Sequence, residues 1–308
     1  MVKVTLFAGG VGGAKMAEGF AGLDGVELSV IGNIADDAAF HGLWISPDID
    51  TLTYSLADRI DRLQGWGVAD EGKRALSVLA ELGADTWMTL GDRDFGLHIY
   101  RSQALARGQT RSQIADHIAR SFGVKARIIL PTDDVVQTRV RVADGWLTFQ
   151  EYFVREQCRP DVLELDFEGI ETAKPTSGAL ECIASADLIV IAPSNPLVSI
   201  DPILKTPGLR DAVASSGAPK IAVSPLINGK VVKGPADRMM KALGLRADAF
   251  GVAQHYAGLV DRMVIDDADV SLVDQIKALG MSTLTTKTLI QSRADKIALA
   301  AKIMAVTE

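Results

Sequence analysis

The sequence predicts an α/β protein built on a Rossmann-like, mostly parallel sheet, with helices on both faces and a helical insertion subdomain. Three observations predict this fold. The chain opens with an apolar run, a glycine-rich loop, a helical pattern and a second apolar run. Later, short apolar runs alternate with helical segments, as they do in sheets made of βαβ units. Between these two parts, residues 51–125 have helical periodicity and few strand candidates.

The opening βαβ unit is predicted from the first two apolar runs. Residues 3–8 end in Gly9-Gly10, which is typical of a buried strand that leads into a loop. Residues 14–23 then have the spacing of a helix, and residues 26–31 form a second apolar run. We expect a right-handed crossover between two parallel strands.

The insertion subdomain is predicted from helical patterns that have almost no strand signal between them. These patterns cover residues 51–62, 70–82 and 112–122. Because they follow the first βαβ unit and interrupt the sheet, we predict two parts: a Rossmann-like core of residues 1–50 and 126–308, and a helical subdomain of residues 51–125.

Strand signals return after the insertion, at residues 126–130. A hairpin is expected where residues 135–142 and 146–154 flank Asp144-Gly145, because Asp-Gly is a strong turn signal. Further short buried strands are predicted at residues 188–192, 220–224 and 262–265.

Composition excludes several classes of protein. The chain has 308 residues, 48% of them hydrophobic, and a formal net charge of −7, which argues against a nucleic-acid partner. Cys158 and Cys182 have neither metal-ligand nor disulfide spacing, so we expect reduced thiols in the core. No apolar run approaches the roughly 20 residues that span a bilayer. We therefore expect a cytoplasmic protein with no membrane partner.

The glycine-rich loop after the first strand is a candidate phosphate-binding site. Gly9, Gly10, Gly12 and Gly13 precede Lys15 at the head of a predicted helix, where backbone amides can hold an anion. The loop is not a complete dinucleotide fingerprint, because Lys15 replaces the third glycine, and it is not a Walker A loop. A tight turn without a ligand is the alternative, and the four glycines with a lysine favour anion binding.

The segment after the second strand is a candidate metal site. Asp36, Asp37, Asp48 and Asp50 lie within fifteen residues of one another on a segment poor in basic residues. Carboxylate oxygens at this density suit Mg²⁺, which takes one or two carboxylates and leaves its other positions to water and phosphate. Capping of a helix that begins near Thr51 is the alternative, but it explains only one aspartate well.

His117 and His255 have no carboxylate or cysteine partner at a suitable spacing, so we expect them to be surface or core residues.

Three more polar segments follow predicted strands or apolar runs. They are Gly91-Asp92-Arg93-Asp94 with His98 and Arg101 beyond it, Pro193-Ser194-Asn195-Pro196, and Ser224-Pro225 with Lys233-Gly234-Pro235. The ends of parallel strands meet at one edge of a sheet, so these segments and the glycine loop are expected to share a ligand.

Taken together and in order, these motifs resemble the 2-phospho-L-lactate transferase family of coenzyme F-420 biosynthesis. The resemblance covers most of the chain, and the Gly-Asp-Arg-Asp and Pro-Ser-Asn-Pro motifs make it specific. It implies transfer of a phosphorylated three-carbon acid from a guanosine-diphosphate-linked donor to the deazaflavin alcohol FO, with release of GMP. It also implies Mg²⁺ and a homodimer.

The resemblance also implies roles for individual residues. Asp36 and Asp50 match metal-binding positions. Their proximity in the sequence, and not the resemblance, makes Asp48 and Asp37 the candidate bases for the FO hydroxyl. Phosphate and nucleotide binding is expected of Gly9, Gly10, Gly12, Gly13, Lys15, Asn33, Ser194, Asn195 and Lys233. Binding of FO is expected of Asp50, His98, Asp92, Arg93, Ser224 and Pro225.

Two other functions share part of this sequence pattern. A non-catalytic regulator that binds a nucleotide-sugar is the alternative, because related proteins share the first glycine and aspartate motifs. A nicotinamide-dependent dehydrogenase is disfavoured, because Ile31-Gly32-Asn33 stands where an acidic residue would hold the ribose. The sequence leaves open whether the acid is phospholactate, phosphoenolpyruvate or phosphoglycerate.

Overall fold

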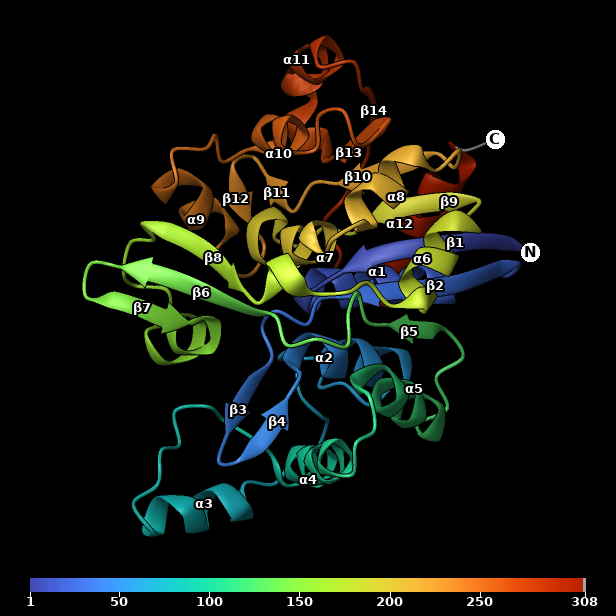
Figure 1. Ribbon diagram of the computed structural model, residues 1–308. Coiled ribbons are helices and arrows are strands. Elements are labelled where there is room, and N and C mark those ends of the chain that lie inside the picture. The colour runs from blue at the N-terminus through green and yellow to red at the C-terminus, as the bar shows by residue number, and fades with distance from the viewer. Residues whose placement is uncertain (307–308) are drawn as a thin grey trace.

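A computed structural model describes residues 1–306 and confirms the α/β fold (Figure 1). Its main sheet has seven strands, and every neighbouring pair in it is parallel. The strands are β1 (Val2–Ala8), β2 (Val26–Gly32), β5 (Arg127–Ile129), β9 (Leu188–Ile191), β10 (Lys220–Val223), β13 (Arg262–Ile265) and β14 (Ser282–Thr285). Their order across the sheet is β14-β13-β10-β9-β1-β2-β5.

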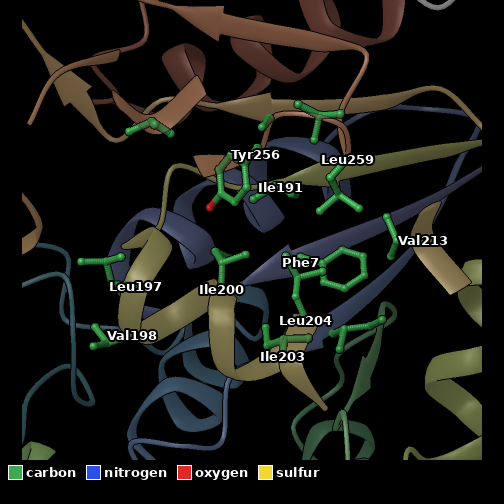
Figure 2. Close-up of a cluster of buried hydrophobic side chains, with 14 of the residues drawn as sticks. Phe7, Ile191, Leu197, Val198, Ile200, Ile203, Leu204, Val213, Tyr256 and Leu259 are labelled. Atoms are coloured by element: carbon green, nitrogen blue, oxygen red, sulfur yellow. The ribbon is translucent and has the colours of Figure 1, made fainter. Parts of the chain in front are cut away.

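The core consists of two apolar layers, one on each face of this sheet. Alternate residues of a strand point to opposite faces, so Leu6 of β1 packs into one layer and Phe7 into the other. On the Leu6 side the sheet is covered by α1 (Gly10–Ala21), α2 (Pro47–Leu56) and α12 (Arg293–Ala305). Figure 2 shows the opposite layer, where Phe7 and Ile191 meet side chains such as Leu204 and Tyr256.

Helices and irregular helical turns connect the later strands. They are η2 (Ile170–Thr172), α6 (Ser177–Ala184), η3 (Pro196–Ile200), α7 (Asp201–Lys205), α8 (Leu209–Ser215), α9 (Ala236–Ala242), α10 (Ala249–His255), η4 (Asp267–Leu272) and α11 (Val273–Ala278). Two short strands, β11 (Leu226–Ile227) and β12 (Lys230–Val231), form a separate antiparallel pair.

The predicted insertion is largely helical, but its first helix starts earlier than predicted. Pro47 occupies the first turn of α2, where its fixed φ and missing N–H are tolerated, so Asp48 and Asp50 lie on this helix and not in a loop before it. Whether residues 51–125 form a subdomain of their own stays a prediction, and the last two residues of the predicted core lie outside the described range. Before α2 lie the paired strands β3 (Ala38–Phe40) and β4 (Leu43–Ile45), and the later helices of the insertion are α3 (Arg74–Glu81), α4 (Asp92–Ala106) and α5 (Arg111–Ser121).

The predicted hairpin is part of a second sheet, ordered β7-β6-β8. Its turn at Asp144-Gly145 is confirmed, because Val142 pairs with Gly145. The second strand is shorter than predicted: the Glu151 carboxylate accepts bonds from the backbone N–H and the hydroxyl of Thr148, and the chain turns into a π-helix. The elements are β6 (Gln137–Val142), β7 (Gly145–Thr148), η1 (Glu151–Arg155) and β8 (Glu164–Glu168), the last of which was not predicted.

Two expectations from composition can be compared with the structure. Cys158 and Cys182 are both free and buried, as predicted for core thiols. Among residues 1–306, no helix combines the length and the apolar character that crossing a membrane requires.

The packing of α1 against α12 predicts opposite effects of the same substitution at two helical glycines. A Cβ on Gly19 would lie 2.4 Å from the carbonyl oxygen of Lys296, so Gly19→Ala should destabilise the fold by about 1–3 kcal/mol. The measurement is urea denaturation of each variant beside the wild type.

Gly96 in α4 is the matched control, because it is exposed and a Cβ there meets nothing within 4 Å. Gly96→Ala should stabilise the protein by about 0.5–1 kcal/mol, since alanine has the higher helix propensity. Equal effects of the two substitutions would contradict the contact between the α1 and α12 backbones.

Candidate active site

A cavity of about 540 Å³ lies at the carboxyl ends of the parallel strands. The loops after β1, β2, β9 and β10 all contribute to its wall, as expected for a ligand site on a sheet of this type. The helical insertion and the turn after β7 also contribute to the wall, through residues such as Tyr54, His98 and Phe149. The polar segments that follow the strands in sequence are thus brought together.

The glycine loop allows the β1 end to pack closely against its neighbours. A Cβ on Gly12 would lie 2.1 Å from the carbonyl oxygen of Pro193, and one on Gly9 would lie 2.7 Å from the Asp48 carboxylate. The Ser194 hydroxyl accepts a bond from the Gly9 N–H at 3.1 Å and donates one to the Gly9 carbonyl at 2.7 Å. Helix α1 begins at Gly10, earlier than predicted, and its first turn borders the cavity.

Not every predicted phosphate-binding residue lines this cavity. Gly13 lies outside the lining and packs against Ala8 and Ser194. Asn33 is also outside it: its amide donates to the Asp48 carboxylate at 3.0 Å and to the Val198 carbonyl at 3.3 Å. Their observed contacts are structural. The predicted residues that do line the cavity are Gly9, Gly10, Gly12, Lys15, Ser194, Asn195 and Lys233.

Two lysines reach the cavity from different segments, Lys15 half-buried and Lys233 exposed. Lys15 donates to the Ile290 carbonyl at 2.9 Å, and Lys233 donates to the Gln64 carbonyl. Burial lowers the pKa of both ammonium groups, and the charge of Lys15 lowers that of Lys233 further. Two ammonium groups close enough to repel each other form a place that favours an anion.

Asp36 and Asp48 form a buried pair of carboxylates in the cavity wall. Burial raises the pKa of Asp36 well above its usual range, and the nearby charge of Asp48 raises it further. Burial also raises the pKa of Asp48, to about 6. One oxygen of Asp36, Oδ1, is buried and has no hydrogen-bond partner among residues 1–306. A buried oxygen in this state favours a cation or a proton beside it.

Asp37 does not line the cavity, although it was predicted as a candidate base. Its carboxylate accepts bonds from the Trp44 indole at 3.0 Å and the Ser46 hydroxyl at 2.8 Å. Burial raises the pKa of Asp37 to about 7. Because the side chain points away from the cavity wall, the geometry favours Asp48 over Asp37 as a group that contacts a substrate.

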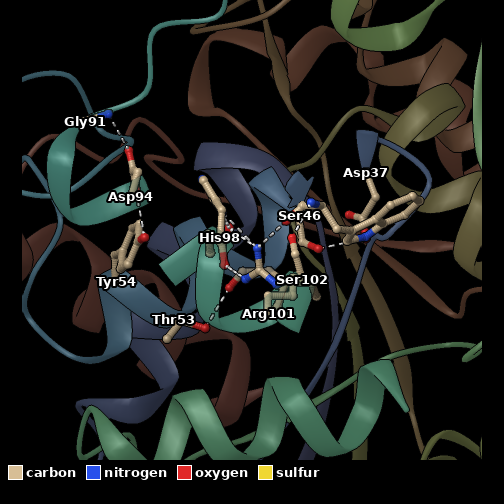
Figure 3. A network of polar contacts seen from close by, with 12 residues as sticks. Asp37, Ser46, Thr53, Tyr54, Gly91, Asp94, His98, Arg101 and Ser102 are labelled. Carbon is tan, nitrogen blue, oxygen red and sulfur yellow. Dashed lines mark hydrogen bonds and ion pairs between the residues drawn. The ribbon is translucent and has the colours of Figure 1, made fainter. Parts of the chain in front are cut away.

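Asp50 is held by a polar network that links α2 to α4 (Figure 3). The Arg101 guanidinium donates to both of its carboxylate oxygens, one of them at 3.0 Å, and to His98 Nδ1 at 3.1 Å. Tyr54 donates to the Asp94 carboxylate at 2.8 Å in the same network. Burial, and then the charge of Arg101, lowers the pKa of His98 to about 4, so its ring is neutral.

Two predicted FO-binding residues do not line the cavity. Asp92 accepts a bond from the Ala75 N–H at 3.0 Å, in the first turn of α3. Arg93 is exposed and donates to the Ala69 carbonyl at 2.7 Å. Both hold the α3 region in place, so the structure does not support a ligand contact for either. The other predicted FO-binding residues, Asp50, His98, Ser224 and Pro225, all line the cavity.

Some features of the site gave no signal that we recognised in the sequence. The wall has an apolar part that was not predicted, made by Ile45, Met88, Leu90, Phe149 and Phe153. Arg101 was noted next to the Gly-Asp-Arg-Asp motif but was not assigned a role. His255 has a carboxylate partner after all, because its Nε2 lies 2.7 Å from Asp201 Oδ1, outside the cavity.

Comparison with known proteins identifies the family. The model of the family described as 2-phospho-L-lactate transferase CofD matches residues 4–302. This chain belongs to that family. The resemblance inferred from the motifs is therefore confirmed.

Curated relatives agree with this assignment, and a solved structure shares the fold. The chain is 40% identical over 289 residues to a phosphoenolpyruvate transferase of Kitasatospora aureofaciens, a match that covers 91% of this chain and 90% of the relative. It is 35% identical over 304 residues to a 2-phospho-L-lactate transferase of Methanococcoides burtonii, covering 98% and 99%. A crystal structure of a UPF0052-family protein from Bacillus halodurans has a TM-score of 0.69 at 17% identity, covering 99% and 100%, and so shares the fold.

The buried charge of Asp36 predicts that its removal stabilises the protein. A raised pKa in the folded state means that the ionised carboxylate costs stability as the pH rises above its usual pKa of 3.8. In the absence of divalent cations, Asp36→Asn should therefore gain about 1 kcal/mol or more at pH 8, and clearly less at pH 4. Denaturation curves at both pH values test this.

Asp24→Asn is the control, because Asp24 is exposed between α1 and β2. This substitution should leave the stability unchanged at both pH values. A loss of stability in Asp36→Asn at pH 8 would show that the carboxylate has a partner that compensates for its burial.

Proposed function

We propose that this protein transfers a phosphorylated three-carbon acid from a guanosine-diphosphate-linked donor to the hydroxyl of FO, releasing GMP. The observation that carries the proposal is one cavity in a CofD-family chain that combines an anion-binding helix end, buried carboxylates and an apolar wall. The homodimer implied by the resemblance stays a prediction. The acidic net charge of −7 is consistent with small-molecule substrates and no nucleic acid.

The donor's diphosphate fits the side of the cavity formed by the glycine loop. The first turn of α1 borders that space, and a helix N-terminus attracts anions. The Gly10 amide already bonds the Asp48 carboxylate, and Lys15 and Lys233 add positive charge to the space. Ser194 fixes the loop through its two bonds to Gly9. Phosphoryl transfer mainly requires positioning and neutralisation of charge, and these groups supply both.

The flat ring of FO fits the apolar part of the wall. Ile45 ends β4, Met88 and Leu90 precede α4, and Phe149 and Phe153 come from the turn after β7 and from η1. The resemblance assigned FO to residues such as Ser224 and Pro225, and this apolar wall is an addition to them. An apolar surface with a few polar groups at its edge is the usual form of a site for a ring of this kind.

Asp36 fits the Mg²⁺ that the resemblance implies. Its Oδ1 is buried without a partner, and the charge of Asp48 beside it adds to the attraction for a cation. Mg²⁺ commonly takes one or two carboxylates and leaves its other positions to water and substrate phosphate. When bound, the ion would neutralise the charge of the donor's diphosphate. Asp50, the other predicted ligand, already accepts hydrogen bonds from Arg101 on both of its oxygens.

In the proposed reaction the FO hydroxyl oxygen attacks the phosphorus atom that carries the three-carbon acid. The new bond joins this oxygen to phosphorus, and the bond between phosphorus and the bridging oxygen of GMP breaks. Asp48 takes up the hydroxyl proton, because it lines the cavity and burial raises its pKa to about 6, near the value useful to a base. Asn33 holds its carboxylate in place.

The reaction is tested by incubating the protein with FO, Mg²⁺ and each guanosine-diphosphate-linked donor: phospholactate, phosphoenolpyruvate and phosphoglycerate. We expect a coupled deazaflavin product by mass spectrometry and one GMP for each product formed. The best donor names the acid. Tight binding of a nucleotide-sugar without any product would instead support a regulatory protein.

Two single substitutions separate the metal ligand from the base. Asp36→Asn should abolish Mg²⁺ binding in calorimetry. Asp48→Asn should lower kcat by about 10²–10⁴-fold, because the proton acceptor is lost. Mg²⁺ should still bind, more weakly, because Asp36 remains as its ligand while the neighbouring charge is lost. Asp24→Asn is again the control. Loss of Mg²⁺ binding in Asp48→Asn would make Asp48 a metal ligand and remove it as the base.

A further inference from the structure

Arg101 of α4 is buried in the wall of the site and contacts two cavity-lining residues at once. Its guanidinium donates to both oxygens of Asp50, and it also donates to the Trp44 carbonyl at 3.4 Å. A guanidinium is always charged, and two parallel bonds fix the plane of a carboxylate. Arg101 therefore fixes the orientation of Asp50 at the cavity wall.

The same guanidinium fixes the tautomer of His98. Its Nη1 lies 3.1 Å from His98 Nδ1, and arginine can only donate, so Nδ1 must accept and carry no proton. The ring proton of a neutral His98 is then on Nε2. No residue in the described part of the chain forms a hydrogen bond with Nε2, and the buried ring lines the cavity.

Asp50 and His98 are adjacent, with 3.8 Å between His98 Nδ1 and Asp50 Oδ2. One offers carboxylate lone pairs and the other offers an N–H, so together they are an acceptor beside a donor. The complementary ligand edge is an N–H next to a carbonyl. The pyrimidinedione edge of a deazaflavin has this arrangement, at the end of a flat ring that the nearby apolar wall would accommodate.

We propose that Arg101 is a positioning residue that presents Asp50 and His98 as a fixed acceptor–donor pair for the imide edge of the deazaflavin ring. The proposal rests on the proposed function, because it takes FO to be the ligand. Asp50 and His98 contact the ring, and Arg101 acts through them. Guanine also carries an N–H beside a carbonyl, so the binding of GDP has to be measured alongside that of FO.

The experiment measures dissociation constants by calorimetry for FO, for FO methylated at the imide nitrogen, and for GDP. For the wild type, methylation should weaken binding roughly tenfold or more, because it removes the N–H that Asp50 accepts. Arg101→Lys should bind FO roughly tenfold more weakly and lose most of the methylation penalty, because lysine cannot hold the carboxylate in a plane. The affinity for GDP should stay within about twofold, since the proposal gives this pair no contact with GDP.

A pair of substitutions at His98 tests the donor separately and leaves the bonds between Arg101 and Asp50 in place. His98→Leu should weaken FO binding roughly tenfold. His98→Gln should recover most of that loss, because its amide N–H can replace Nε2–H. Should Arg101→Lys fail to fold, this pair alone still decides the question. Arg120→Lys is the matched control, because Arg120 pairs only with exposed Asp116 on α5.

Each other outcome has a defined meaning. An equal methylation penalty in wild type and Arg101→Lys would overturn the proposal, as would equal binding of FO by His98→Leu and His98→Gln. A larger loss for GDP than for FO would assign the pair to guanine and also overturn it. If the wild type transfers the acid to FO while these results fail, only the pair is refuted. If the wild type does not bind FO, the proposed function fails with it.

Discussion

The site depends on how closely the end of β1 packs against its neighbours. Gly9 and Gly12 leave no room for a Cβ, because the Asp48 carboxylate and the Pro193 carbonyl occupy that space. This contact brings α2 and the loop after β9 to the same point, and Ser194 fixes it with two bonds to Gly9. The glycines are thus required for packing, and the same geometry places the first turn of α1 at the cavity.

The carboxylates in the cavity are not stabilised alike. Asp50 has a buried arginine across both oxygens, whereas Asp36 keeps an unpartnered oxygen next to the charge of Asp48. A fold that keeps such a group gives up stability, and functional sites are where proteins usually do so. The carboxylates differ in their hydrogen-bond partners, and this difference suits them to different roles. In the proposed reaction Asp36 would bind the cation and Asp48 would accept the proton, whereas Asp50 is held by Arg101 as a hydrogen-bond acceptor.

The names of the relatives give two different acids, phosphoenolpyruvate and 2-phospho-L-lactate, and these two acids are chemically similar. Phosphoenolpyruvate transferases and 2-phospho-L-lactate transferases both align with this chain over about nine-tenths of its length or more. Phospholactate and phosphoenolpyruvate differ by a few atoms, so a change in one wall residue can alter the preference between them. The glycine loop and the apolar wall of the cavity come from different elements.

The sequence by itself determined the βαβ opening, the turn at Asp144-Gly145, the glycine loop and the family, because these depend on local periodicity and on motifs in order. It placed Asp36, Asp48 and Lys15 at the site for the same reason. Only the tertiary structure decided that Asp37 faces Trp44, that Asp92 and Arg93 support α3, and that Arg101 holds Asp50. Such assignments depend on which elements pack together, and Arg101 and Asp50 are 51 positions apart in the chain. Residue spacing carries no information about a contact that long-range packing creates.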